Sequence, residues 1–216
     1  MTWISLFNSF LIMILLISLF TFYMIGVNLF IILLGLSLSF LILETSNNKN
    51  IFHYIDSFWL FIFSEIMVFF SLLCCCLWFN ENYIYNLSHY LEIPFFGCFL
   101  LIGSSLTATY YHNFNNIEST NNSIYLTIIL GVCFIILQLI EFSDCSINIL
   151  TSVYHSSCFC TVGLHFSHVI IGLFLLISIL LLDFNYLNQY YINIIIWYWH
   201  FVDYIWLLVF SIVYLF

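Results

Sequence analysis

Pairs of polar residues stand inside the long apolar stretches of this chain, and their types are those that can do chemistry. His200 and Asp203 are three residues apart, so they share one face of a helix. They lie in an apolar run, residues 192–216, that is long enough to cross a bilayer. Polar groups at that depth are costly against lipid, so we expect both to face other helices or a cavity. A satisfied ion pair in an aromatic helix is the plainer interpretation.

His165 and His168 have the same spacing on a second apolar stretch. Two such histidines can bind a metal, or ligate a haem together with a histidine on an opposed helix. Only His200 is available for the haem arrangement, and Asp203 already stands beside it. Buried polar groups usually satisfy one another, so we expect this chain to bind no haem and no transition metal by itself.

Two further acidic positions occur inside apolar runs. Glu65 lies about ten residues into its run, where desolvation disfavours a charged carboxylate, and we expect a protonated acid. It is either a group that exchanges protons or a structural hydrogen-bond donor, and chemistry alone favours the structural role. Gln138 and Glu141 share a helix face, and hydrogen bonds between helices are the plainest interpretation of that pair.

Composition sets the class of protein that must position these groups. Of 216 residues, 65% are hydrophobic and only 5% are charged, which excludes a soluble globular domain. Lys49 is the only basic residue, which excludes a basic nucleic-acid surface. The scarcity of residues with GC-rich codons indicates an AT-biased gene, as in many organelle genomes. Eight cysteines include no Cys-x-x-Cys pair, so we interpret them as small buried hydrophobes.

The apolar runs predict an all-α polytopic membrane protein with seven transmembrane helices. Residues 1–216 form one integral membrane domain, with helices one and two at about 3–43 and helices three to seven at about 56–216. A turn is expected from Tyr23 to Asn28, around Gly26, and the first clear loop from Glu44 to Asn50. The remaining helices are expected at about 56–79, from Pro94 to 112, and at 123–142, 151–182 and 192–216. Lys49 alone places the N-terminus on the matrix or cytoplasmic side.

Four motifs, in order along the chain, are similar to one family. They are Ser64-Glu65 with its aromatic continuation, Leu91-Glu92-Ile93-Pro94, the string from Leu130 to Glu141 that continues to residues 163–172, and Trp197-Tyr198-Trp199-His200-Phe201-Val202-Asp203 with Trp206. From about Phe58 onward the chain resembles subunit III of cytochrome c oxidase, the haem–copper terminal oxidase. Departures include Cys74 and Trp78 where the family has Trp and His, Asn113 where a second His is usual, and Phe166 in place of Gly.

The resemblance implies a two-helix hairpin and a five-helix bundle with a lipid cleft between them. It implies a non-redox subunit that supports assembly, lipid binding and sustained proton uptake, while the complex reduces dioxygen with electrons from cytochrome c and pumps protons. Catalytic, cofactor and metal residues are then absent, with haem and copper held by partner subunits. Expected partners are subunit I as the main contact, subunit II, accessory subunits and phospholipids, with no nucleic acid. The expected location is the mitochondrial inner membrane, with the bacterial plasma membrane as the less favoured choice.

With so few basic residues, lipid headgroups in that cleft need other donors, and the lipid-cleft candidates are His53, Tyr54 and Trp59. The six candidates for buried polar or proton-exchange roles are expected to face inward among helices three to seven, with His200 and Asp203 finding partners on neighbouring helices. These six are Glu65, Glu141, His165, His168, His200 and Asp203.

Two other functions compete with this interpretation. A small proton-coupled transporter would use Glu65, His165, His168 and Asp203 as a relay, and would need a polar cavity and helices broken at mid-span. The absence of Pro from the interiors of the spans argues against it. A di-haem membrane cytochrome would show a Soret band in the isolated polypeptide.

Overall fold

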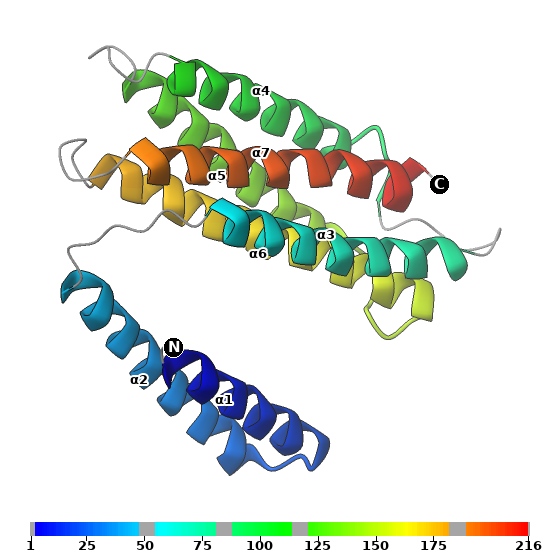
Figure 1. The fold of residues 1–216 in the computed structure, drawn as a ribbon. Helices are drawn as coiled ribbons and strands as arrows, with labels where there is room; N and C mark the ends of the chain where they lie inside the picture. Colours follow the sequence, from blue (N-terminus) through cyan, green and yellow to red (C-terminus); the bar gives the residue numbers. More distant parts are fainter. Residues whose placement is uncertain (1–2, 48–54, 81–87, 114–120, 182–188, 216) are drawn as a thin grey trace. The chain divides into compact units, whose positions relative to one another are not determined.

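The structure is a computed structural model that describes residues 3–47, 55–80, 88–113, 121–181 and 189–215. The all-helical prediction is confirmed, because the described residues form seven α-helices and no strand (Figure 1). The helices are α1 (Trp3–Phe20), α2 (Met24–Asn47), α3 (Ile55–Trp78), α4 (Ile93–Asn113), α5 (Asn121–Asp144), α6 (Val153–Leu181) and α7 (Gln189–Val209), followed by the π-helix η2 (Phe210–Leu215). Lys49, His53 and Tyr54 lie outside the described residues.

The chain divides into two compact units, Met1–His53 and Tyr54–Phe216. The first unit is a hairpin of α1 and α2, and its turn falls at residues 21–23, where Phe22 has a φ of 52°. The turn predicted from Tyr23 to Asn28 was therefore placed too late. Gly26 lies inside α2, where a Cβ atom would come within 2.6 Å of the Ser18 Cβ. The glycine permits close approach of the two helices and does not make the turn.

The end of α2 also differs from its prediction. The first loop was expected from Glu44, but α2 continues through Asn47. Apolar composition marks where a chain meets hydrocarbon, whereas backbone hydrogen bonds continue a helix past that boundary. Within the same unit, the Ser37 hydroxyl donates to Asn8 Oδ1 over 2.6 Å, which fixes the register of α1 against α2.

The second unit contains α3 to α7, all five of which are long and apolar enough to cross a membrane. Pro94 is the second residue of α4, a position where its missing N–H leaves no helical hydrogen bond unmade. Helix α7 packs against α3, α4 and α6, and α5 packs against α4 and α6. Figure 1 shows α7 between α4 and α3. The polar motif of α7 is therefore brought against three other helices.

Trp199 of α7 lies in a closely packed part of this unit. Its indole is fully buried, and it contacts Gly131 of α5 and Gly172 of α6. A Cβ atom at Gly131 would lie 2.9 Å from this ring, and one at Gly172 would lie 2.8 Å from it. Both glycines are thus needed because the large ring leaves no space for a side chain.

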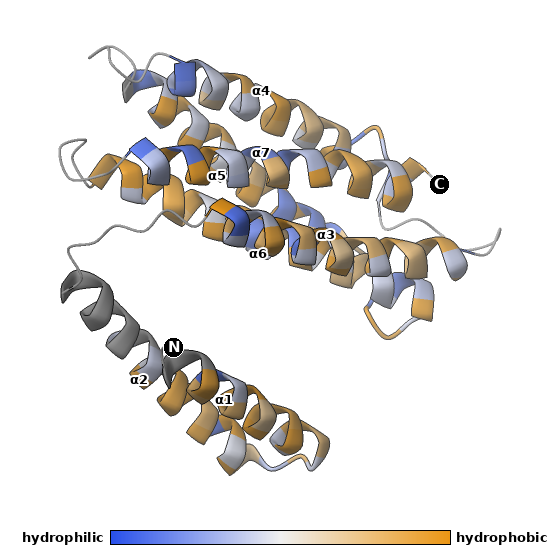
Figure 2. Ribbon diagram, in the orientation of Figure 1, coloured by the Kyte–Doolittle hydropathy of each residue, from blue (hydrophilic) through white to orange (hydrophobic). Residues whose placement is uncertain are grey.

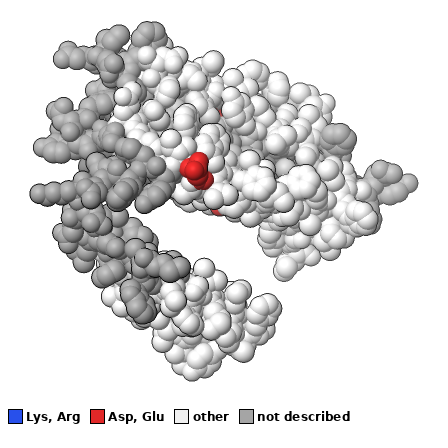
Figure 3. Space-filling model, in the orientation of Figure 1, with Lys and Arg blue, Asp and Glu red and all other residues white. Residues whose placement is uncertain are grey.

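The outward faces of the helices are apolar, as lipid contact requires (Figure 2). On the face drawn in Figure 3 the described atoms are almost all uncharged, with one small acidic patch. Phe166, which stands where the resemblance gives Gly, packs edge-on against Phe142 of α5 with ring centroids 6.1 Å apart. The larger side chain therefore fills space between α5 and α6.

Candidate functional site

Glu65, His168 and Tyr198 meet where α3, α6 and α7 come together. Glu65 Oε2 lies 3.2 Å from His168 Nε2, and His168 Nδ1 lies 2.8 Å from the Tyr198 hydroxyl. Phe69 packs against the imidazole with ring centroids 5.4 Å apart, which shields one side of it from other polar groups. The three polar residues thus form a hydrogen-bonded chain across three helices.

Proton positions in this chain follow from the donors available. If the Tyr198 hydroxyl donates to Nδ1, a neutral His168 donates its Nε2 proton to Glu65, and every group has a partner. The Glu65 side chain keeps 22% of its surface exposed, so it lies at the edge of the unit. This arrangement can share a proton among Glu65, His168 and Tyr198 inside the membrane-spanning part of the unit.

His165 lies one helical turn away from His168 but contacts different groups. Its side chain is completely buried, and its Nε2 donates to the carbonyl oxygen of Val202 over 3.2 Å. The Trp206 ring lies 4.8 Å from the imidazole, centroid to centroid. The two histidines therefore do not converge on one point. In the part of the chain that the structure describes, no group of three or more His, Cys, Asp or Glu could hold a metal ion.

Asp203 is buried without a hydrogen-bond partner on either carboxyl oxygen. Ser104 of α4 is next to the carboxyl, but its hydroxyl donates to Leu101 O over 2.8 Å and accepts from Trp199 Nε1 over 3.1 Å. Nδ1 of the half-buried His200 also lacks a partner. The expectation that His200 and Asp203 find partners on neighbouring helices stays a prediction, because Ser104 of α4 stands beside the Asp203 carboxyl but its hydroxyl also serves Leu101 and Trp199.

Glu141 forms a third cluster. Gln138 Nε2 donates to Glu141 Oε2 over 2.7 Å, and the Ser88 hydroxyl donates to Oε1 over 2.7 Å. The buried Tyr214 hydroxyl of η2 interacts with both Gln138 and Glu141. Side chains from α5, η2 and the segment before α4 are tied together at this carboxyl, which is a structural use of a buried acid.

The six candidate residues thus fall into separate groups. Glu141, His165, His168 and Asp203 are buried, whereas Glu65 and His200 are partly exposed. Across residues 55–80, 88–113, 121–181 and 189–215, no hydrogen bond links the Glu65 chain to Asp203 or to Glu141. The relay that a transporter would need is not continuous in this part of the chain.

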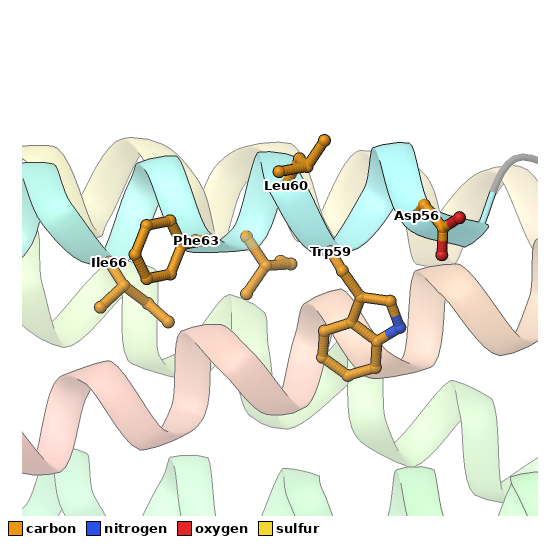
Figure 4. Close-up of a pocket in the computed structure, with 6 residues that line it drawn as sticks. Asp56, Trp59, Leu60, Phe63 and Ile66 are labelled. Carbon is orange, nitrogen blue, oxygen red and sulfur yellow. The ribbon is translucent and has the colours of Figure 1, made fainter.

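An apolar groove lies on α3 near its first turns. It has a volume of about 490 Å³, and Figure 4 shows the residues that line it as sticks. Trp59 is 54% exposed, its ring lies 5.8 Å from the Trp197 ring of α7, and Asp56 stands at the start of the helix. The lining residues are Asp56, Trp59, Leu60, Ile62, Phe63 and Ile66. Of the lipid-cleft candidates, only Trp59 lies in the described residues.

Tyr198, Ser88 and Tyr214 contribute to these clusters but were not singled out from the sequence. Tyr198 is two residues from His200, yet it contacts a histidine thirty positions earlier in the chain. Ser88 and Tyr214 are ordinary polar residues near the ends of helices. No local signal marks them, because their importance comes from partners on other helices.

Comparison with known proteins decides the family. A family model described as cytochrome c oxidase subunit III matches residues 4–216. The chain belongs to this family. Relatives named cytochrome c oxidase subunit 3 include those of Spodoptera frugiperda (36% identical over 134 residues), Myxine glutinosa (37% over 131) and Drosophila melanogaster (34% over 134). Each alignment covers 57% of this chain, with 88% of the Spodoptera sequence and 50% of the other two.

The chain therefore spans about half the length of most of these relatives. Family membership together with the five long apolar helices supports a membrane location. The resemblance that the four sequence motifs predicted is confirmed, and the transporter and di-haem alternatives are set aside.

Proposed function

We propose that this chain is the non-redox third core subunit of a membrane-bound cytochrome c oxidase. The complex reduces dioxygen with electrons from cytochrome c and pumps protons, and its haem and copper belong to partner subunits. The family match supports the assignment, and the separate hydrogen-bonded clusters support a chain that holds structure rather than a redox centre.

One observation carries the specific role, namely the hydrogen-bonded chain from Glu65 through His168 to Tyr198. It begins at a partly exposed carboxyl on α3 and ends on α7, so it can move a proton between the Glu65 carboxyl and the interior of the bundle. A carboxyl with a fixed imidazole partner is held ready in one geometry, which favours repeated transfer over many turnovers. We assign to this chain the support of sustained proton uptake by the complex.

Lipid binding is the second part of the role. The groove on α3 is lined mostly by apolar side chains and includes Trp59, whose indole N–H can donate to a phosphate or an ester oxygen. Since the described helices α3 to α7 contain no Lys or Arg, headgroup contacts must come from such neutral donors or from other subunits.

The proposed setting is the mitochondrial inner membrane, with the N-terminus on the matrix side. The proposed main contact is subunit I, with subunit II and accessory subunits completing the complex. Purifying the assembly through a tag on this chain tests the proposal: partners carrying haem and copper are expected, and the separated chain is expected to contain neither. Stoichiometric haem or copper on this chain would refute the non-redox assignment.

Substitution of Glu65 tests the proton role. Glu65→Gln keeps a hydrogen bond to His168 but cannot release a proton. The initial rate of oxygen consumption is expected to stay near wild type, while activity falls off after fewer turnovers. Glu92→Gln is the matched control, because Glu92 is an exposed carboxyl at the start of α4. Equal durability of the Glu65 and Glu92 variants would refute the role of this chain in sustained uptake.

A further inference from the structure

Two cysteines from different helices face each other inside the second unit. Cys76 of α3 and Cys158 of α6 have their sulfur atoms 3.8 Å apart, and the residues are 1% and 0% exposed. Neither belongs to the clusters around Glu65, Asp203 or Glu141. A buried pair of thiols at this distance is the arrangement from which a disulfide forms, since each sulfur already contacts its reaction partner.

Each hydrogen bond around the pair can be assigned a donor and an acceptor without conflict. The Cys158 thiol donates to the Cys76 sulfur, and the Cys76 sulfur lies 3.9 Å from the Thr161 hydroxyl oxygen. Thr161 donates its own proton to the carbonyl oxygens of Ser157 and Cys158, over 3.1 and 2.8 Å. Its oxygen is therefore the acceptor for the Cys76 thiol. This small polar ring holds the two sulfurs in one relative orientation.

Formation of the bond requires the two sulfur atoms to approach each other. A disulfide needs sulfurs about 2.0 Å apart, so the pair must approach by about 1.8 Å from its present separation. Cys76 is two residues before the end of α3, and Cys158 is five residues after the start of α6. Helix ends open more easily than helix centres, which favours this approach over one at the middle of the helices.

The other cysteines of these helices are placed differently. Cys74, Cys75 and Cys160 are exposed, whereas Cys98 of α4 is buried against Trp206. Cys74 and Cys75 precede Cys76 directly, but successive residues on a helix point in different directions. The sequence run of three cysteines therefore contains one member that faces α6.

We propose that Cys76 and Cys158 form a redox-active dithiol that an alkyl hydroperoxide oxidises to a disulfide between α3 and α6. Both thiols are buried among apolar side chains, so the oxidant that we assign is an uncharged one that dissolves in lipid. In the first step the Cys76 sulfur takes the terminal oxygen of the peroxide, giving a sulfenic acid and an alcohol. The peroxide is reduced by two electrons, and Cys76 is oxidised by two.

In the second step the Cys158 sulfur attacks the Cys76 sulfur along the line that their hydrogen bond now occupies. The sulfur–sulfur bond forms, the sulfur–oxygen bond breaks, and the departing hydroxyl takes the Cys158 proton to leave as water. A small dithiol reverses the reaction by thiol–disulfide exchange and ends as its own disulfide. The inference does not depend on the proposed oxidase role, because it needs only these two helices.

The bond would clamp the same pair of helices that carries the Glu65–His168 contact. Glu65 precedes Cys76 by eleven residues, and His168 follows Cys158 by ten, so the two contacts lie about 15 Å apart along antiparallel helices. A disulfide at Cys76 and Cys158 is therefore expected to limit the relative movement of α3 and α6 at the Glu65–His168 contact.

The test uses membranes that contain the assembled complex, treated with tert-butyl hydroperoxide. Free thiols on this chain are then counted by maleimide labelling after denaturation in detergent. We expect six labelled thiols in place of the eight present before oxidation, and peptic peptides joined through Cys76 and Cys158. Dithiothreitol is expected to restore all eight. Eight free thiols after treatment, or a bond that joins Cys74, Cys75 or Cys160, would overturn the proposal.

Matched variants separate the pair from the other thiols. Cys158→Ser removes one partner, and no joined peptide is expected, whereas Cys98→Ser removes a buried cysteine outside the pair and should leave the bond unchanged. Two thiols lost together from the Cys158→Ser chain would count against the pair. If the Cys158→Ser chain does not assemble, the free thiols are counted in Cys76→Ser instead. If neither variant assembles, the peptides joined in the unsubstituted chain show which two cysteines form the bond.

Discussion

Glu141 and Asp203 are both 4% exposed, yet their surroundings are opposite. The Glu141 carboxyl accepts hydrogen bonds from Gln138 and Ser88, whereas both oxygens of Asp203 lack a partner. The two carboxyl groups are thus equally buried but differ in the number of hydrogen bonds that they accept. The difference arises because Glu141 stands near helix ends, where free side-chain donors occur, and Asp203 stands where Ser104 already serves other groups.

Burial alone therefore does not predict how much a buried acid contributes to the stability of the chain. Removing an acid that has partners leaves those partners unsatisfied, at about 1–3 kcal/mol for each buried group. Removing an acid that has none leaves nothing unsatisfied and replaces an unpaired polar group with an apolar one. Glu65 stands between these extremes, with one partner, His168, and a partly exposed side chain.

Glu141→Leu is expected to have the largest effect. It leaves the Gln138 amide and the Ser88 hydroxyl without their acceptor, which costs about 1–3 kcal/mol for each. The thermal midpoint for release of this chain from the purified complex measures it, since 1 kcal/mol corresponds to about 2–4 °C for a chain of this size. Glu141→Gln keeps an acceptor and is the control. Equal midpoints for Leu and wild type would remove the distinction between the two acids.

Glu65→Leu comes next, with an expected loss of about 1–3 kcal/mol, because His168 Nε2 loses its acceptor at a largely buried position. The loss of stability is expected to be smaller than for Glu141→Leu, because Glu65 has a single hydrogen-bond partner. The same thermal midpoint measures it, with Glu65→Gln as the control that keeps the contact. If Glu65→Leu lowers the thermal midpoint more than Glu141→Leu does, the number of hydrogen-bond partners does not set the order of the two effects.

Tyr198→Phe is expected to cost about 0.5–1.5 kcal/mol, the usual contribution of one hydrogen bond. The ring and its packing remain, so only the hydroxyl contact with His168 Nδ1 is lost. Tyr204→Phe is the control, because Tyr204 lies on the same helix and is 64% exposed. The two variants are compared by thermal midpoint, and indistinguishable midpoints would show that the hydroxyl contact does not stabilise the chain.

Asp203→Leu is expected to have the smallest effect, within about 1 kcal/mol of wild type, because no hydrogen-bond partner is left behind. If Asp203 has a hydrogen-bond partner, the loss of stability is instead severe for Leu and mild for Asn, because Asn keeps an acceptor. The midpoints of Asp203→Leu and Asp203→Asn decide between them. A large loss in Leu alone would show that the carboxyl has a partner in the assembled complex.

The relay role of Asp203 is tested by the same Asn variant. Oxygen consumption and proton pumping per assembled complex are expected to remain normal, since Asp203 is outside the Glu65–His168–Tyr198 chain. Full assembly with lost activity would instead place Asp203 in a proton path.

The helices and the family follow from the sequence alone. The lengths of the apolar runs predicted seven helices because lipid requires every backbone group to be paired within its own segment, and Pro94 correctly predicted the start of α4. Motifs around Glu65, Glu141, His165 and Trp199 carried the family resemblance, since they are local strings of residues. The turn around Gly26 and the loop from Glu44 were misplaced because hydropathy reports contact with lipid and does not mark where a helix ends.

Only the tertiary structure decided which polar groups have partners. Glu65 contacts His168 more than a hundred positions later, and Cys76 meets Cys158 at a similar separation. Periodicity places a residue on a helix face, but it does not say which residue of another helix lies opposite. The register of α3 against α6 is set by packing across the whole interface, and the Glu65–His168 and Cys76–Cys158 contacts follow from that register.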